Sequence, residues 1–254
     1  MDQKQIIDSW NQRAALQNSD DVALRDHFQR NIELRFIESL LRPCKSILEV
    51  GSGTGIVTQL LLKFAERLDG FDASEEMLNI LRKKITQANC NIRLDSLPTP
   101  TNEYKDDYDI VVSCRVLINL ESSGAQAAAI EWIASRLKTG GLLILIEGSS
   151  EGLDQIDKMR LACGLSILDR AQFNLNMSKK FIEQNCNCFF ELQQYQSSGT
   201  YDYLTRIYYP LLVGQDKLQY NTQFHNSAYV MHCASPKDEL SKYSRLHMLA
   251  FRKK

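Results

Sequence analysis

Three glycines stand within five residues, at positions 51, 53 and 55, directly after the short apolar run SILEV at 46–50. An apolar run followed by a glycine-rich turn and an amphipathic segment is typical of a strand, a tight turn and a helix in an α/β sheet. Glycine has no side chain, so the turn lets the backbone approach a ligand closely. The feature predicts an α/β fold with a ligand site after its first strand.

The alternation of strand and helix patterns continues along the chain. Apolar or alternating runs predict strands at 46–50, 67–72, 91–94, 108–114, 142–148, 188–195 and 245–254. Apolar residues at spacings of three and four predict helices at 19–41, 56–68, 74–85, 121–141, 151–165 and 179–185. This rhythm predicts a doubly wound parallel α/β sheet.

The helix boundaries follow from capping signals. In the first helix an apolar stripe runs through Leu24, Phe28, Ile32, Phe36, Ile37 and Leu40. Ser19 or Asp20 is expected to cap its start, because short polar side chains accept from free helix amides. Ser74 is expected to cap the 74–85 helix, and the glycines at 140 and 141 are expected to close the 121–141 helix.

The whole chain, 1–254, is expected to form a single domain. Its predicted parts are a helical arm (1–41), a ligand-binding core (42–150) and a region that completes the sheet (151–254). Within the last part, 197–240 is polar, holds six of the ten tyrosines and precedes the final strand. A stretch of this length is too long for an ordinary connection, so it is predicted to be a lid.

Composition excludes several classes of protein. The net charge of −1 gives no general attraction for nucleic acid or an anionic membrane. No apolar run reaches the roughly 18 residues of a membrane span, and no secretory signal is expected at the start. The seven cysteines lack zinc-ligand spacing, so we expect reduced thiols, no metal and a cytoplasmic protein.

The glycine turn does not fit a dinucleotide site. Such a site needs G-x-G-x-x-G, but here position 56 is Ile and the third glycine comes one residue early. Glu49 would also be a poor neighbour for a pyrophosphate. No tyrosine is followed four residues later by lysine, the pair that small reductases carry.

Five segments resemble, in order, the class I S-adenosylmethionine-dependent methyltransferases. They are LEVGSGTG, GFDASEEML, RLDSLP, YDIVVS and LKTGGLLILIE, spread over 47–147. The resemblance implies the Rossmann-like methyltransferase fold, a seven-stranded, mostly parallel sheet. It also implies S-adenosylmethionine as the cofactor, with an ammonium and a sulfonium that suit a neighbouring carboxylate.

The resemblance assigns residues to the two ends of the cofactor. Glu49 helps to hold the region around the ammonium, and the methionine end is bounded by Gly51, Ser52, Gly53, Cys114 and Arg115. Asp72 accepts from both ribose hydroxyls, Ala73 and Met77 line the adenine, and Asp95, with Ser96 and Leu97 beside it, accepts from its amine. Two alternatives stay open: Asp72 as a helix cap and Asp95 as a turn residue.

Catalytic and acceptor residues are harder to find, because methyl transfer needs alignment more than a strong acid or base. Glu147, which ends a strand, and His225 are the candidate bases, with a capped strand end and a structural histidine as the alternatives. Asn119 stands where many relatives carry histidine. Tyr203, Arg206 and Tyr209 suit a polar, ring-shaped or anionic acceptor, or simple packing.

A finer resemblance is to methyltransferases that accompany bacterial surface-polysaccharide biosynthesis, although AQFNLN at 171–176 lacks the histidine expected there. It implies carbohydrate modification at an oxygen or nitrogen atom, with a nucleotide sugar or glycan as the acceptor. The alternatives are a quinone, lipid-like or natural-product acceptor, RNA or protein methylation, and a non-catalytic cofactor-binding subunit. The oligomeric state is open.

Overall fold

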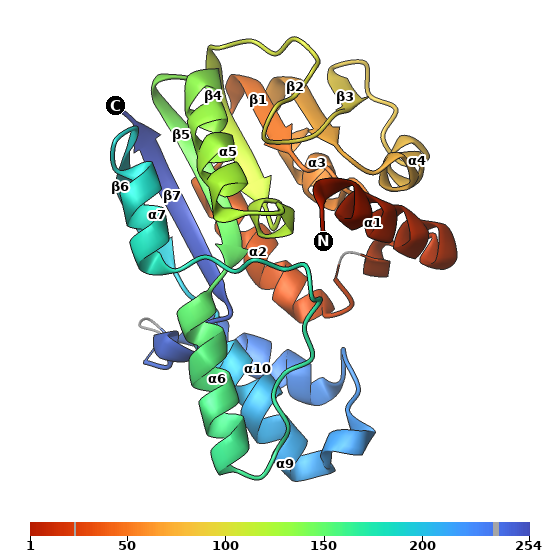
Figure 1. Cartoon of the computed structure of the whole chain (residues 1–254), viewed down its shortest axis with the longest axis vertical. Coiled ribbons are helices and arrows are strands. Elements are labelled where there is room, and N and C mark those ends of the chain that lie inside the picture. Colours follow the sequence, from red (N-terminus) through yellow and green to blue (C-terminus); the bar gives the residue numbers. More distant parts are fainter. Residues whose placement is uncertain (23, 236–238) are drawn as a thin grey trace.

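The computed structural model describes residues 1–22, 24–235 and 239–254 and contains one seven-stranded sheet (Figure 1). The strand order is β3-β2-β1-β4-β5-β7-β6, and β7 alone runs antiparallel to the other strands of the sheet. The strands are β1 (Cys44–Val50), β2 (Ala65–Asp72), β3 (Cys90–Leu94), β4 (Tyr108–Cys114), β5 (Leu137–Gly148), β6 (Phe190–Gln196) and β7 (Leu246–Lys253). The predicted fold class is confirmed.

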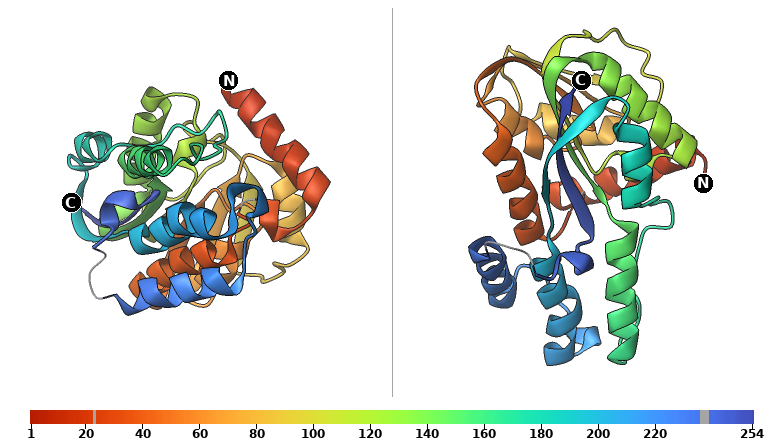
Figure 2. Two further views of the ribbon diagram at one scale, coloured as in Figure 1. Left: turned by 90° about the horizontal axis from the view of Figure 1, so that it is seen from below. Right: turned by 90° about the vertical axis from the view of Figure 1, so that its left-hand side faces the viewer.

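Helices cover both faces of the sheet, and each face has its own apolar core (Figure 2). On one face, Ile133 of α5 (Ser123–Arg136) and Ile182 of α7 (Lys179–Cys186) belong to the core that covers the sheet. On the other, α2 (His27–Leu40), α3 (Ile56–Leu61) and α10 (Gln223–Ala234) supply the core residues, including Phe36 and Leu61. The burial of both faces explains why the central strands are continuously apolar.

The predicted start of the 19–41 helix is wrong. Residues 19–41 divide into a short 3₁₀ turn, Asp20–Val22, and α2, and a separate helix α1 (Gln3–Gln17) precedes them. Asp26, and neither Ser19 nor Asp20, caps α2 by accepting from the Gln29 amide at 3.0 Å. A cap needs a side chain at the point where the buried stripe begins, and Asp26 is the acid nearest to it.

Two further boundaries were placed too late. α3 ends at Leu61, and Ala65 to Leu68, predicted as helix, pair with β1 as the start of β2. Likewise α5 ends at Arg136, and Gly140 and Gly141 lie inside β5 instead of capping a helix. In both cases strand pairing overrides a short run whose apolar spacing also fits a helix.

The segment predicted as a lid is helical and lies between β6 and β7, as expected. It contains α8 (Gly199–Tyr203), the π-helical turn η3 (Leu204–Tyr208), α9 (Tyr209–Val213) and α10, while 236–238 lie outside the described residues. With α6 (Ser150–Ala162) these helices form a lobe below the sheet in Figure 1. We call α6 and 197–235 the helical lobe; its role as a lid stays a prediction.

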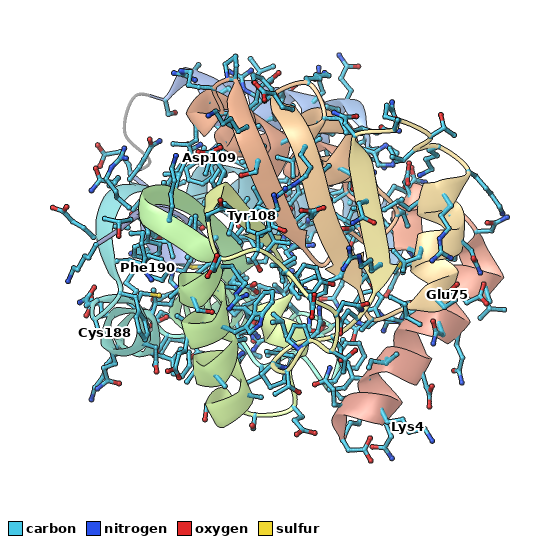
Figure 3. All side chains as sticks on the ribbon, turned by 90° about the horizontal axis from the view of Figure 1, so that it is seen from above. Lys4, Glu75, Tyr108, Asp109, Cys188 and Phe190 are labelled. Carbon is cyan, nitrogen blue, oxygen red and sulfur yellow. The ribbon has the colours of Figure 1, made fainter. Side chains whose placement is uncertain are left out.

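The two edges of the sheet formed by the amino ends and by the carboxyl ends of the parallel strands differ in character. At the amino edge, seen from above in Figure 3, Tyr108 and Asp109 begin β4. The Tyr108 hydroxyl donates to Asp69 at 2.6 Å, and Asp109 accepts from the Ser46 amide at 2.9 Å. These bonds tie strands together. The parallel strands point their carboxyl ends toward the helical lobe, which is where open α/β sheets bind ligands.

Candidate active site

A cavity of about 650 Å³ lies at the carboxyl edge of the sheet, a size suited to a small-molecule site. One end is lined by the glycine turn and the residues after β2 and β3. The other end is lined by the helical lobe, with Arg206, Tyr209 and His225. The cavity therefore joins the predicted cofactor residues to the predicted acceptor residues.

The glycine turn has the backbone shape that the sequence suggested. Gly51 has φ +74°, and a Cβ placed there would lie 2.2 Å from a Val116 methyl group. The amides of Gly51 and Ser52 both donate to the Phe71 carbonyl at 2.9 Å, which fixes the turn against β2. Ser52 Oγ is buried and has no hydrogen-bond partner among the described residues. This hydroxyl lies beside Glu49 and Gly70, so what the turn offers to a ligand in the cavity is its backbone.

Asp72 is held from two sides at the end of β2. Its Oδ2 accepts from the Gly53 amide at 2.8 Å and its Oδ1 from the Ser74 amide at 2.8 Å. Each oxygen keeps a second acceptor position, as a ribose diol requires. Burial raises the pKa of the carboxyl, while the Ser74 and Gly53 amides oppose that shift. Asp72 lines the cavity, so its predicted ribose contact is geometrically open.

Ala73, Met77, Ser96 and Leu97 line the cavity beside Asp72, where the resemblance places the adenine. Asp95 lines it too, but its carboxylate is already engaged. Oδ1 accepts from the Ser96 and Thr101 amides at 2.9 Å, and Oδ2 from the amide and side chain of Asn102 and from Tyr104. These contacts favour the turn alternative, and the predicted amine contact stays untested.

Glu49 lies behind the glycine turn and does not line the cavity. It is 2% exposed, and its Oε2 accepts from the Thr58 hydroxyl at 2.6 Å. Its Oε1 has no partner among the described residues. Burial raises the pKa of this carboxyl to about 8, with Asp72 adding to the shift. Its predicted action on the ammonium region would therefore be exerted from beneath the turn.

The predicted methionine end contains an acid that the sequence did not single out. Cys114 and Arg115 line the cavity after β4, and Arg115 has φ +60°. The Arg115 Nε lies 3.5 Å from Oε1 of Glu33, which also lines the cavity and is 4% exposed. Burial raises the pKa of Glu33, although Arg115 opposes the shift. The sequence did hold a signal for Glu33: it is an acid that directly follows Ile32, a residue of the apolar stripe of α2.

Glu147 does not reach the cavity, contrary to what a general base requires. It is fully buried, and its carboxylate accepts from the amides of Val116 (3.1 Å), Leu117 (2.9 Å) and Ile118 (3.1 Å). Burial raises its pKa to about 7 despite these donors. The geometry favours a positioning role for the segment after β4, and its predicted catalytic role remains untested.

The predicted acceptor residues divide in two. Tyr209 and Arg206 line the cavity, whereas Tyr203 packs its ring on Tyr243 at 5.0 Å and does not line it. The prediction for Tyr203 is not supported because that side of α8 faces a small apolar cluster. Asn119 lines the cavity, donates to the Arg115 carbonyl at 2.8 Å and leaves a buried Oδ1 without a partner among the described residues.

His225 is the histidine that lines the cavity within the described chain. Its Nδ1 lies 2.9 Å from the Thr222 hydroxyl, and Tyr209 packs edge-on at 5.0 Å. Its Nε2 makes no hydrogen bond to another described residue. Burial lowers the pKa of His225, so the ring is neutral near pH 7 and can accept a proton.

The arm contributes a wall of the cavity that sequence reasoning missed. Trp10 and Arg13 of α1 line it, and the Trp10 ring contacts Phe173 edge-on at 5.9 Å. The Arg13 guanidinium lies over both rings, at 5.1 and 5.3 Å from their centres. These contacts join α1 to the segment after α6 across the cavity. The spacing of α1 alone gave no indication of this long-range pairing.

Comparisons with known proteins match part of the chain in sequence. A family model described as a methyltransferase domain matches residues 47–141. A ubiquinone biosynthesis O-methyltransferase of Hydrogenovibrio crunogenus is 31% identical over 99 residues, which cover 38% of this chain and 40% of the relative. The chain thus matches less than half of that curated relative's length.

Solved structures resemble the chain over nearly its whole length. N-methyltransferase NodS from Bradyrhizobium japonicum, solved with S-adenosyl-L-homocysteine, has a TM-score of 0.63 and 14% identity and covers 98% of both chains. A putative Haloferax volcanii methyltransferase, in complex with its Trm112 activator, has a TM-score of 0.63 and 16% identity over 96% of both chains. At such identities these similarities establish the fold.

Residues 47–141 thus match a methyltransferase domain, and the chain as a whole has the fold of the solved methyltransferases that it resembles. The match over 47–141 agrees with the predicted enzyme class and with S-adenosylmethionine as the cofactor. The residues present fit the cofactor, because Asp72 keeps acceptor capacity for a diol and the backbone of Gly51 and Gly53 lines the cavity beside it. None of the described helices has the length and apolarity of a membrane span.

Proposed function

We propose that this protein transfers a methyl group from S-adenosylmethionine to an oxygen or nitrogen atom of a small polar acceptor, a sugar or sugar-linked group of surface-polysaccharide biosynthesis. The observation that carries the proposal is the single cavity that links Asp72 and the glycine turn to Tyr209, Arg206 and His225. Aromatic rings beside hydrogen-bonding groups suit the flat apolar face and polar rim of a sugar.

The cofactor supplies an electrophilic methyl group, so the protein's task is to align the acceptor and remove its proton. The neutral His225 ring offers Nε2 as a proton acceptor, and Thr222 holds the other ring nitrogen. Glu33 is the second candidate, since its Oε1 makes no hydrogen bond to a described residue and it lines the cavity near Arg115. Both groups line the cavity.

A quinone or lipid-like acceptor is the second candidate function. The observation in its favour is the similarity of 99 residues to a ubiquinone biosynthesis O-methyltransferase. That match covers 38% of this chain, and the matched family domain, residues 47–141, does not include the helical lobe. The polar lining of the lobe favours the sugar over the quinone.

The test is a methyl-transfer assay with labelled S-adenosylmethionine against nucleotide sugars, sugar phosphates, uronic acids and dihydroxybenzoates. The proposal expects a methylated sugar, identified by mass spectrometry, and at least a tenfold loss of turnover in His225→Gln. His27→Gln, at an exposed histidine of α2, is the matched control. Methylation of the dihydroxybenzoates alone would favour the quinone function. Cofactor binding without transfer to any acceptor would favour the non-catalytic subunit.

A further inference from the structure

The helical-lobe end of the cavity carries more positive charge than its neighbours neutralise. Arg160 of α6, Arg206 of η3 and Arg245, just before β7, all line it. Arg245 is paired with Asp202, its Nε lying 2.6 Å from Oδ1, and Arg206 forms an ion pair with Asp26. Two carboxylates thus serve three guanidinium groups.

Arg160 is the cation left over. It is 3% exposed and makes no ion pair within the described chain. Its Nε donates to the Ser166 carbonyl at 2.7 Å, and a second nitrogen donates to the Arg206 carbonyl. Carbonyl groups are neutral, so they satisfy its hydrogens without compensating its charge. A buried cation beside another cation is costly unless an anion is near.

Arg206 retains a hydrogen-bond donor directed at no protein group. The residue is 8% exposed, and its Nε has no partner among the described residues. Its guanidinium carbon lies 5.3 Å from the centre of the Tyr220 ring, which also lines the cavity. Guanidinium groups bind carboxylate and phosphate through such free edges.

Nearby acids do not remove this excess. Asp169 lines the cavity but is exposed at the surface. Glu33 lines it closer to the sheet, where it already faces Arg115.

Within the described lobe, the π-helical turn that carries Arg206 is also a local irregularity of a kind found at functional sites.

We infer that the acceptor carries an anionic group, a carboxylate or a phosphate, which Arg160 and Arg206 bind at the helical-lobe end of the cavity. This inference rests on the proposed function and narrows its acceptor to an acidic or phosphorylated molecule. The anion would take the free Arg206 Nε edge and compensate the charge of Arg160. The far end of the cavity, with Asp72, keeps the cofactor, so the two ligands bind without sharing a subsite.

The experiment measures thermal stabilisation of the protein, saturated with S-adenosylhomocysteine, by inorganic phosphate and by acetate at constant ionic strength. Acetamide is the neutral match for acetate. We expect saturable stabilisation by one anion, which identifies the phosphate or the carboxylate class, and none by acetamide. The affinity should fall about tenfold or more in Arg160→Gln, as the loss of a charge-assisted contact predicts.

Two further variants complete the test. The double variant Asp26→Asn with Arg206→Gln removes both charges of the buried pair and keeps a helix-capping side chain at position 26. It should weaken anion binding as much as Arg160→Gln does. Arg82→Gln, at an exposed ion pair with Glu75, should change nothing. Absence of saturable binding by either anion, or binding that survives in both cavity variants, would overturn the inference. Stabilisation by S-adenosylhomocysteine in the same melts reports separately on the proposed function.

Discussion

Asp72 Oδ2 accepts a hydrogen bond of 2.8 Å from the Gly53 amide, so one carboxylate joins the end of β2 to the glycine turn. Its other oxygen accepts from the Ser74 amide, at the start of α4 (Glu75–Arg82). Asp72 thereby sets the position of the turn while keeping acceptor positions for a diol. Its two roles make it the residue on which cofactor binding most depends.

Asp72→Ala should weaken S-adenosylmethionine binding by more than about 1 kcal/mol, the usual value of a charge-assisted hydrogen bond. Titration calorimetry measures the change. Asp69→Ala, on the same strand but at the amino edge with Tyr108, should alter stability and leave the affinity unchanged. Equal affinities for wild type and Asp72→Ala would remove Asp72 from the ribose site.

Glu147→Gln should lower stability by about 1–3 kcal/mol, because an amide group would then face an N–H that now donates to a carboxylate oxygen. Cofactor affinity should be retained. If Glu147 positions the segment after β4, the folded variant keeps the shape of its pH–rate profile, with turnover reduced less than about tenfold. Loss of the acidic limb of that profile, where a general base becomes protonated, without loss of stability would instead make Glu147 the base.

Glu49 predicts a pH dependence of stability. Its pKa rises from 4.5 to about 8 in the folded protein, so the neutral form is favoured there. The contribution of this neutral carboxyl to the free energy of unfolding is complete below pH 4.5 and is lost as the pH rises through 8. Glu49→Gln should therefore gain stability relative to wild type between pH 6 and 9, on the order of a few kcal/mol.

Denaturant unfolding at several pH values checks this. Glu147 and Glu33 also have raised pKa values, so only the difference between wild type and Glu49→Gln isolates Glu49. If the difference in the free energy of unfolding between wild type and Glu49→Gln stays constant from pH 6 to 9, the Glu49 carboxyl is already ionised at neutral pH.

Trp10→Ala should loosen the wall that α1 builds over the cavity. The ring contacts Phe173 at 5.9 Å and supports Arg13, so its loss separates the arm from the segment after α6. We expect the dissociation rate of S-adenosylhomocysteine to rise on the order of tenfold, measured by stopped-flow displacement. Leu16→Ala, on the same helix at a residue 86% exposed, should leave the rate unchanged. Equal rates in both variants would contradict the closing role of α1.

Local pattern predicted the sheet and the glycine turn at its carboxyl edge, because both depend on residues near one another in sequence. The run before Gly51 is a strand, Ser74 caps α4, and Asp72 reaches the turn. Prediction from local pattern failed where pairing between segments distant in the sequence determines the secondary structure. Ala65 joins β2 because β1 lies beside it, a fact that the spacing of the apolar residues does not contain.

The acceptor side was less predictable for the same reason. Glu33 reaches the cavity only because α2 packs beside β4, and Arg160 only because α6 lies against η3. Glu147 looked catalytic at a strand end, yet three amides of the next segment fold back onto it. Such contacts follow from tertiary packing, which single-sequence reasoning does not supply.

The central claim is that this cavity binds S-adenosylmethionine and no dinucleotide. Titration calorimetry of the purified protein with S-adenosylmethionine and, separately, with NADH tests it most directly. The account predicts micromolar binding of S-adenosylmethionine, weakened in Asp72→Ala, and no binding of NADH. Binding of NADH, or no binding of S-adenosylmethionine, would contradict it.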